Sequence, residues 1–279
     1  MKRKLFFTIP SLLVLCPCSI NMASCHNKEI SYKTMEVVTF QPFFDQTIAE
    51  PTIPGWEIPE GFDKYRDLLK GAGDYLKNHI NTIDYDQDDY SINKRITSDL
   101  ISKLGKNQII VFEGHGSFTQ ISDQDPKSYS VMWTGPYWGQ EPVKQEDIDE
   151  LRIVNAEGNE AISLHFIEEY CGDLSGSIVY LGNCYSGRDV TFAQAFLNKG
   201  AEAVIGNSDT IRVAYNNLIE YTTIKKLGEI NKKTDLPYTL YEALEYAKSI
   251  YGKNDKEKDE WAAGAEPLLF GNGNFRLSK

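Results

Sequence analysis

Three short runs of mostly apolar residues stand out in the chain after residue 100. They are Gln108–Glu113, Ser177–Leu181 and Ala203–Ile205. Uninterrupted runs of this length, bounded by glycine or polar residues, are typical of strands that are buried on both faces, as in a parallel sheet. We therefore predict three central strands.

Segments with apolar residues at helical spacing separate and flank these strands. The predicted helices are Asp63–Asn78, Asn93–Leu104, Glu160–Tyr170, Thr191–Asn198, Arg212–Ile230 and Thr239–Tyr251. Val37–Phe40 predicts one early strand, and Glu266–Phe270 predicts a final extended segment. Strands that alternate with helices predict an α/β sandwich with a mainly parallel central sheet.

The N-terminus has the pattern of an export signal. Met1–Lys4 is positively charged, Leu5–Leu15 is mostly apolar, and Cys25 follows the small residues Ala23 and Ser24. This order resembles a bacterial lipobox, whose cysteine is acylated and becomes the first residue of the mature chain. The resemblance implies a surface lipoprotein anchored to the membrane only through its lipid. Plain secretion and an uncleaved helix remain the alternatives.

We predict three regions along the 279 residues. Residues 1–24 form the signal peptide, residues 25–60 are an extended leader or linker with several prolines and glycines, and residues 61–279 form one domain. The net charge of −11 argues against a nucleic-acid partner, because phosphate binding needs a surplus of Lys and Arg. The oligomeric state has no signature in the sequence.

Candidate chemistry follows the first two central strands. His115 comes two residues after the first predicted strand, and Cys184 comes three residues after the second. The carboxyl ends of parallel strands meet at one edge of a sheet, and neighbouring strands lie about 4.8 Å apart. If these strands are neighbours, the imidazole can take the proton of the thiol, which is mostly protonated at neutral pH. The backbone N–H groups of Gly116 and Cys184 can hold a developing oxyanion.

The order of three segments carries a family resemblance. They are IIVFEGHGSF (109–118), IVYLGNCYSG (178–187) and FLNKGAEAVIGNS (196–208), with a weaker fourth segment at 267–277. Together they resemble the caspase-like cysteine peptidases of clan CD, in particular the CHAT, gingipain and clostripain types. The resemblance implies a three-layer α/β/α sandwich and a thiol protease that hydrolyses protein or peptide substrates, with no required cofactor.

The resemblance also implies residue roles. Cys184 is the nucleophile, His115 is the general acid and base, and the N–H groups of Gly116 and Cys184 form the oxyanion hole. Glu113 is either a carboxylate that orients His115 or an ordinary strand-end residue. A Cys171–Cys184 disulfide, or an inactive relative that serves as a binding module on the cell surface, are the alternatives.

Substrate preference has one candidate determinant. Asp209 and Ser208 follow the third strand, where relatives build the S1 wall, and Asp209 could accept a basic side chain. Its alternative role is to cap the helix that begins near Arg212. Relatives that cleave after Arg or Lys commonly carry Asp two residues before the cysteine, whereas this chain has Gly182.

Two further segments have open interpretations. The stretch between His115 and Cys184 contains Tyr129, Trp133, Tyr137 and Trp138, and it forms either a packed hairpin or the rim of a substrate cleft. The acidic segment Asp84–Asp89 is either a solvated loop or a calcium site, although it lacks the EF-hand pattern. No Cys or His pattern after residue 25 indicates a structural zinc site. His79 and His165 are predicted to be structural or surface residues.

Overall fold

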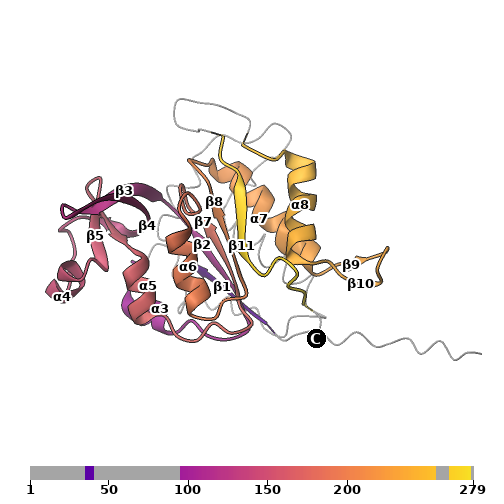
Figure 1. Cartoon of the computed structure of the whole chain (residues 1–279), viewed down its shortest axis with the longest axis horizontal. Coiled ribbons are helices and arrows are strands. Elements are labelled where there is room, and N and C mark those ends of the chain that lie inside the picture. The colour runs from indigo at the N-terminus through magenta and orange to yellow at the C-terminus, as the bar shows by residue number, and fades with distance from the viewer. Residues whose placement is uncertain (1–34, 41–94, 256–263, 278–279) are drawn as a thin grey trace, which may run out of the picture.

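The main sheet of the protein has five strands (Figure 1). The computed structural model describes residues 35–40, 95–255 and 264–277. In spatial order the strands are β1 (Glu36–Phe40), β2 (Gln108–Glu113), β7 (Ile178–Gly182), β8 (Ala203–Asn207) and β11 (Pro267–Gly271). The first four are parallel, and β11 runs antiparallel to β8. The predicted central strands and the α/β fold class are confirmed, and the sheet is mixed.

Helices cover both faces of this sheet. The helices are α3 (Ser98–Ser102), α5 (Leu164–Tyr170), α6 (Val190–Asn198), α7 (Val213–Leu227) and α8 (Leu240–Tyr251). In β2, Ile109 and Val111 pack in the core beneath α7 and α8, whereas Ile110 and Phe112 pack in the core beneath α3, α5 and α6. Successive side chains of β2 point to opposite faces of the sheet, and both faces are covered by helices. Each side chain of this strand must therefore be apolar or have a hydrogen-bond partner in the interior.

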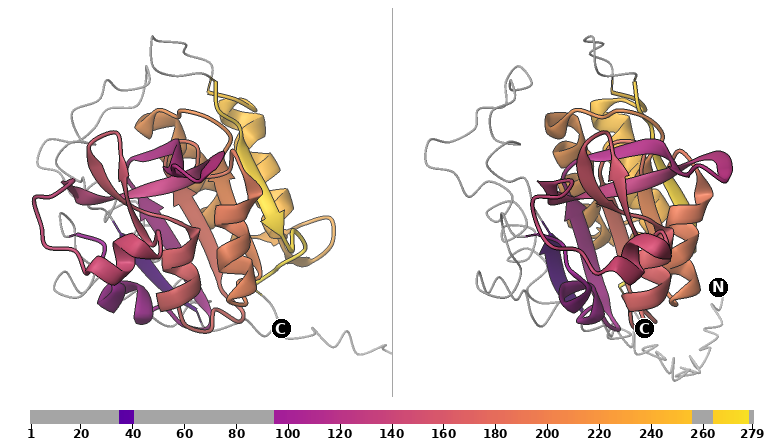
Figure 2. Two further views of the ribbon diagram at one scale, coloured as in Figure 1. Left: turned by 60° about the vertical axis from the view of Figure 1, so that its left-hand side comes forward. Right: turned by 90° about the vertical axis from the view of Figure 1, so that its left-hand side faces the viewer.

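A second, antiparallel sheet is inserted between β2 and β7. Its spatial order is β3 (Gly116–Ser122), β4 (Asp125–Tyr137), β6 (Asn159–Ile162) and β5 (Ile153–Ala156), and the short helix α4 (Gln145–Asp149) precedes β5. Figure 2 shows β3 and β4 crossing the edge of the main sheet at which β2 ends. The hairpin interpretation of this insertion is confirmed. A two-stranded ribbon, β9 (Ile230–Asn231) with β10 (Leu236–Pro237), connects α7 to α8.

Local sequence signals explain where several helices begin. Thr239 and Glu242 form a capping box at the start of α8, and the Asp189 side chain caps α6. After α6 the chain turns at Gly200, whose φ of 96° is the left-handed conformation that glycine adopts without strain. These signals place α6 and α8 within one residue of their predicted boundaries.

Four predicted boundaries need correction. The helix predicted over Arg212–Ile230 ends at Leu227, and Ile230 begins the strand β9. The helix predicted over Glu160–Tyr170 begins only at Leu164, because the preceding residues pair as β6 with both β4 and β5. In the helix predicted over Asn93–Leu104, the residues described from Arg95 onward are helical only in α3. Strand β1 pairs with β2, so the main sheet includes residues from the segment predicted to be a leader. The helix predicted at 63–78 lies outside the described residues.

Candidate active site

The two candidate catalytic residues follow neighbouring strands that are in register. Glu113 of β2 pairs with Gly182 of β7, and His115 and Cys184 each lie two residues beyond this pair. The Asn183 amide donates a hydrogen bond of 3.1 Å to the carbonyl of His115. The two strand extensions are therefore in direct contact.

Gly116 makes this contact tight. A Cβ atom at Gly116 would lie 2.7 Å from the carbonyl oxygen of Cys184 and 2.9 Å from that of Val131 on β4. Real Cβ atoms essentially never approach backbone oxygen this closely. Only glycine therefore fits between the Cys184 turn and β4 without moving backbone.

Cys184 carries a half-buried thiol in a turn and forms no disulfide among the described residues. Its sulfur lies 3.5 Å from the backbone nitrogen of Ile211 and 3.7 Å from the carbonyl oxygen of the same residue. An N–H group directed at sulfur can stabilise negative charge there. The next residue, Tyr185, has a φ of 59°, an uncommon conformation for a residue other than glycine, and the chain reverses sharply behind the thiol.

His115 is half-buried beside an aromatic residue of the inserted sheet. Its ring centroid lies 5.3 Å from that of Trp133, whose indole N–H donates to the Ser117 hydroxyl at 2.9 Å. The Trp133 backbone N–H also donates to the His115 carbonyl. Burial lowers the pKa of His115, so the imidazole is neutral and able to accept a proton at neutral pH. Sequence reasoning had placed Trp133 in the hairpin but had missed its contact with His115.

Glu113 points toward α7. Its carboxylate accepts a 3.0 Å hydrogen bond from the Asn216 amide and interacts with the carboxyl group of Glu220. Burial and the neighbouring Glu220 raise the pKa of Glu113 well above its ordinary value, and burial raises that of Glu220 to about 7. These contacts describe a proton-sharing carboxyl pair beneath the sheet edge. They do not support the interpretation of Glu113 as a residue that orients His115.

Gly182 leaves room for this pair. A Cβ atom at Gly182 would lie 2.6 Å from a Glu113 carboxylate oxygen and 2.7 Å from the Asn216 amide nitrogen. The space that a side chain would need at position 182 is therefore filled from the neighbouring strand and from α7.

Buried polar side chains around Asn207 hold the Cys184 turn, and the sequence analysis had overlooked them. The Asn207 amide donates to the carbonyls of Leu181 and Asn183, and the Ser186 hydroxyl donates to the same two carbonyls. The Asn207 backbone N–H in turn donates to the Ser186 hydroxyl. Polar residues directly after apolar runs were the available signal, because buried polar groups must find partners.

The predicted S1 residues already have partners within the fold. Asp209 pairs with Arg188 at 3.2 Å through one carboxylate oxygen and accepts from the Thr210 N–H through the other. The Ser208 hydroxyl accepts a 2.9 Å hydrogen bond from the backbone of Glu266. The alternative role of Asp209 as a helix cap is wrong, because the N-cap residue of α7 is Arg212.

The other candidate residues lie away from the two strand ends. Cys171 is a free thiol in the core, where burial raises its pKa to about 11, and the alternative Cys171–Cys184 disulfide is not formed. His165 lies on the surface of α5 and pairs with Glu168, as predicted. Among the described residues, His, Cys, Asp and Glu side chains form no group of three suited to a metal ion. Cys25, His79 and the acidic segment at 84–89 lie outside the described residues.

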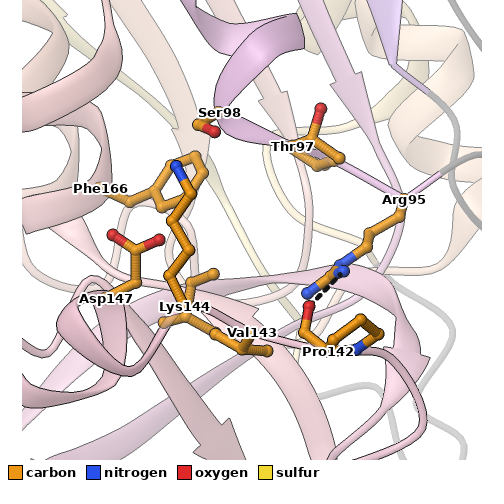
Figure 3. A pocket seen from close by; sticks show the side chains of 10 residues that line it. Arg95, Thr97, Ser98, Pro142, Val143, Lys144, Asp147 and Phe166 are labelled. Carbon is orange, nitrogen blue, oxygen red and sulfur yellow. Dashed lines mark hydrogen bonds between the residues drawn. The ribbon is translucent and has the colours of Figure 1, made fainter.

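A pocket of about 140 Å³ opens between α3, α4 and α5 (Figure 3). Two charged side chains of the pocket form hydrogen bonds inside the protein. Arg95 donates to Glu160 and to the Pro142 carbonyl. Asp147 accepts from Arg152 and Tyr170. Neither His115 nor Cys184 lines it. The pocket is therefore separate from the strand ends.

Comparison with known proteins adds no family assignment. No family model matches the sequence, and no curated protein matches it either. Within the described part of the chain, no helix has both the length and the apolar character needed to span a membrane.

Proposed function

We propose that the protein is a cysteine endopeptidase with a caspase-like three-layer fold, in which Cys184 is the nucleophile and His115 is the general acid and base. The observation that carries the proposal is the contact between the two strand extensions after Glu113 and Gly182. A neutral imidazole and a thiol that forms no disulfide among the described residues, on segments in contact, are the parts that thiol-dependent acyl transfer needs. The resemblance of the sequence segments to clan CD peptidases supports the same reading.

The reaction would proceed in two steps. The Cys184 sulfur, after its proton passes to His115, attacks the peptide carbonyl carbon, and the N–H groups of Gly116 and Cys184 hold the oxyanion. Collapse breaks the C–N bond, and the leaving amine takes the proton from His115. Water, deprotonated by His115, then hydrolyses the thioester and regenerates the thiol.

A peptide-library digest with the wild type and with Cys184→Ala tests the proposal. The wild type should cleave peptides, and Cys184→Ala should lose cleavage while keeping its melting temperature. Cys171→Ala is the matched control, since it removes the other described thiol far from the strand ends. Cleavage that survives in Cys184→Ala would refute the nucleophile assignment. Parallel digests with and without calcium test whether the ion is needed.

Alkylation by iodoacetamide separates this proposal from an inactive surface-binding module. Cys184 should react much faster than Cys171 at neutral pH, because the buried Cys171, with a pKa of about 11, is almost fully protonated there. Equally slow labelling of both thiols would favour the binding module.

We also propose that the domain works outside the cell, exported and tethered through an acylated Cys25. The sequence at residues 1–25 supports this location. Cys25→Ala should then move the protein from the membrane fraction to the soluble fraction. Unchanged membrane association of this variant would argue against the lipid anchor.

A further inference from the structure

Arg188 lies one turn after Cys184, on a segment that runs beside the chain following β8. Two backbone hydrogen bonds join these segments, from Gly187 N–H to the Asn207 carbonyl and from Tyr185 N–H to the Asp209 carbonyl. In a third contact, the Ile211 N–H approaches the Cys184 sulfur. The Arg188–Asp209 ion pair bridges the same two segments. The guanidinium is thus tied to the backbone framework that positions the thiol.

Two aromatic rings lie close to the Arg188 guanidinium. Its central carbon lies 5.0 Å from the ring centroid of Phe118 on β3 and 5.2 Å from that of Tyr185. Contacts of this kind stabilise the cation and restrict its motion. The Ser130 hydroxyl, which donates to the Tyr185 carbonyl at 2.6 Å, holds β4 against the same turn. The side chain is therefore ordered in advance by residues of the inserted sheet and of the turn.

Most hydrogen-bonding capacity of Arg188 remains open. The side chain is 43% exposed, and one Asp209 oxygen, 3.2 Å from Nη1, is its only acceptor among the described residues. A guanidinium has five N–H donors in a planar fork that matches a carboxylate. Asp209, in contrast, uses both of its oxygens within the fold. The unused hydrogen-bond donors of Arg188 at this edge of the sheet therefore suit an anion better than a cation.

We infer that Arg188 determines specificity by binding a carboxylate of the substrate next to the scissile bond. This inference rests on the proposed peptidase function. It reverses the sequence expectation, in which Asp209 would select a basic side chain. Asp209 instead holds the guanidinium in place and leaves its other donors for the substrate.

A pair of electrophilic peptide probes tests the inference without turnover. Two otherwise identical peptidyl chloromethyl ketones, ending in Glu or in Gln, label Cys184 as its thiolate displaces chloride. We expect the Glu probe to label the wild type about tenfold faster or more, as charge-assisted hydrogen bonds allow. In Arg188→Gln this rate ratio should fall to about one, and in Arg188→Lys it should fall only partly, because the charge remains while the planar fork is lost.

The matched control is Lys106→Gln. Lys106 forms an exposed 2.9 Å ion pair with Asp173 and precedes β2, at the opposite edge of the main sheet. This variant changes the net charge by the same amount and also breaks an ion pair, but it should keep the wild-type Glu-to-Gln ratio. An equal fall of the ratio in Lys106→Gln would assign the effect to overall charge and overturn the role of Arg188.

The remaining outcomes show whether the carboxylate belongs to a side chain or to the C-terminus of the substrate. They also distinguish a failure of the Arg188 inference from a failure of the peptidase proposal. The carboxylate could instead be the C-terminus of the substrate. In that case the two probes would react equally, but the wild type would cleave a peptide with a free C-terminus faster than the same peptide with a C-terminal amide. Arg188→Gln would lose this difference. The inference about Arg188 would be overturned if the Glu and Gln probes labelled Cys184 at equal rates and the free-acid and amide peptides were cleaved at equal rates. The peptidase proposal would remain intact in that case. No labelling of Cys184 by either probe and no cleavage of any peptide would overturn the peptidase proposal itself.

Discussion

The substitution Gly116→Ala gives the sharpest test of the contact between the two strand ends. The added Cβ atom would lie 2.7 Å from the Cys184 carbonyl oxygen and 2.9 Å from the Val131 carbonyl oxygen, whereas ordinary contact begins at 3.4 Å. Both neighbours are backbone atoms, so no flexible side chain can move to relieve the overlap. The His115 segment must therefore shift by about half an ångström or more relative to Cys184.

This shift should lower both stability and activity. Overpacking typically costs about 1–3 kcal/mol, so urea denaturation should show a loss of about 2 kcal/mol in the free energy of unfolding. Displacements of about 1 Å at reacting groups can cost about 10²-fold in rate, so we expect kcat/KM for peptide cleavage to fall about tenfold or more under conditions in which the variant remains folded.

The matched control for Gly116→Ala is Gly105→Ala. A Cβ atom at Gly105 would meet nothing within 4 Å, so the same chemical change should leave stability within about 0.5 kcal/mol and activity unchanged. If Gly116→Ala matched Gly105→Ala in both measurements, the close approach of Gly116 to Cys184 would be refuted, and the oxyanion-hole geometry with it.

Two further predictions concern pH. Folding raises the pKa of Glu220 from 4.5 to about 7, so the folded state retains a proton that the unfolded chain releases; stability should therefore fall by up to about 3 kcal/mol as pH rises through this interval. Glu220→Gln, compared with the wild type by urea denaturation at pH 5 and pH 8, should make this fall smaller, while the burial of Glu113 keeps part of it in place. A pH dependence unchanged from the wild type would contradict the contribution of Glu220. Because burial lowers the pKa of His115, the acidic limb of the pH profile of kcat/KM should lie below pH 6.5, and a limb above that value would exclude neutral His115 as the base.

The main sheet could be predicted because its strands are buried on both faces. Continuous apolar runs such as that of β2 have few other stable arrangements, and helical spacing marked α6 and α8 clearly. The strand β6 was mistaken for helix because its four residues pair on both sides with β4 and β5, a tertiary constraint that local pattern does not contain. The place of β1 in the sheet depends equally on a partner far along the chain.

The sequence predicts which strand ends form the candidate site, but it does not predict which side chains contact each other there. Parallel strand ends brought His115 and Cys184 to one edge, as the order of the apolar runs implied. The direction of Glu113 toward α7 and the pairing of Asp209 with Arg188 depend on which side chains face each other across elements. Sequence spacing does not encode those contacts between side chains.

The hairpin turn between β3 and β4 divides the site between two parts of the chain. Residues before the exposed turn at Asp123 and Gln124 contribute β1, β2, β3 and His115, whereas those after it contribute Cys184 and the remaining strands. The halves associate through β2 with β7 and through β3 with β4. Two polypeptides divided at this turn would therefore have to pair through both pairs of strands before His115 and Cys184 could lie at one edge of the sheet.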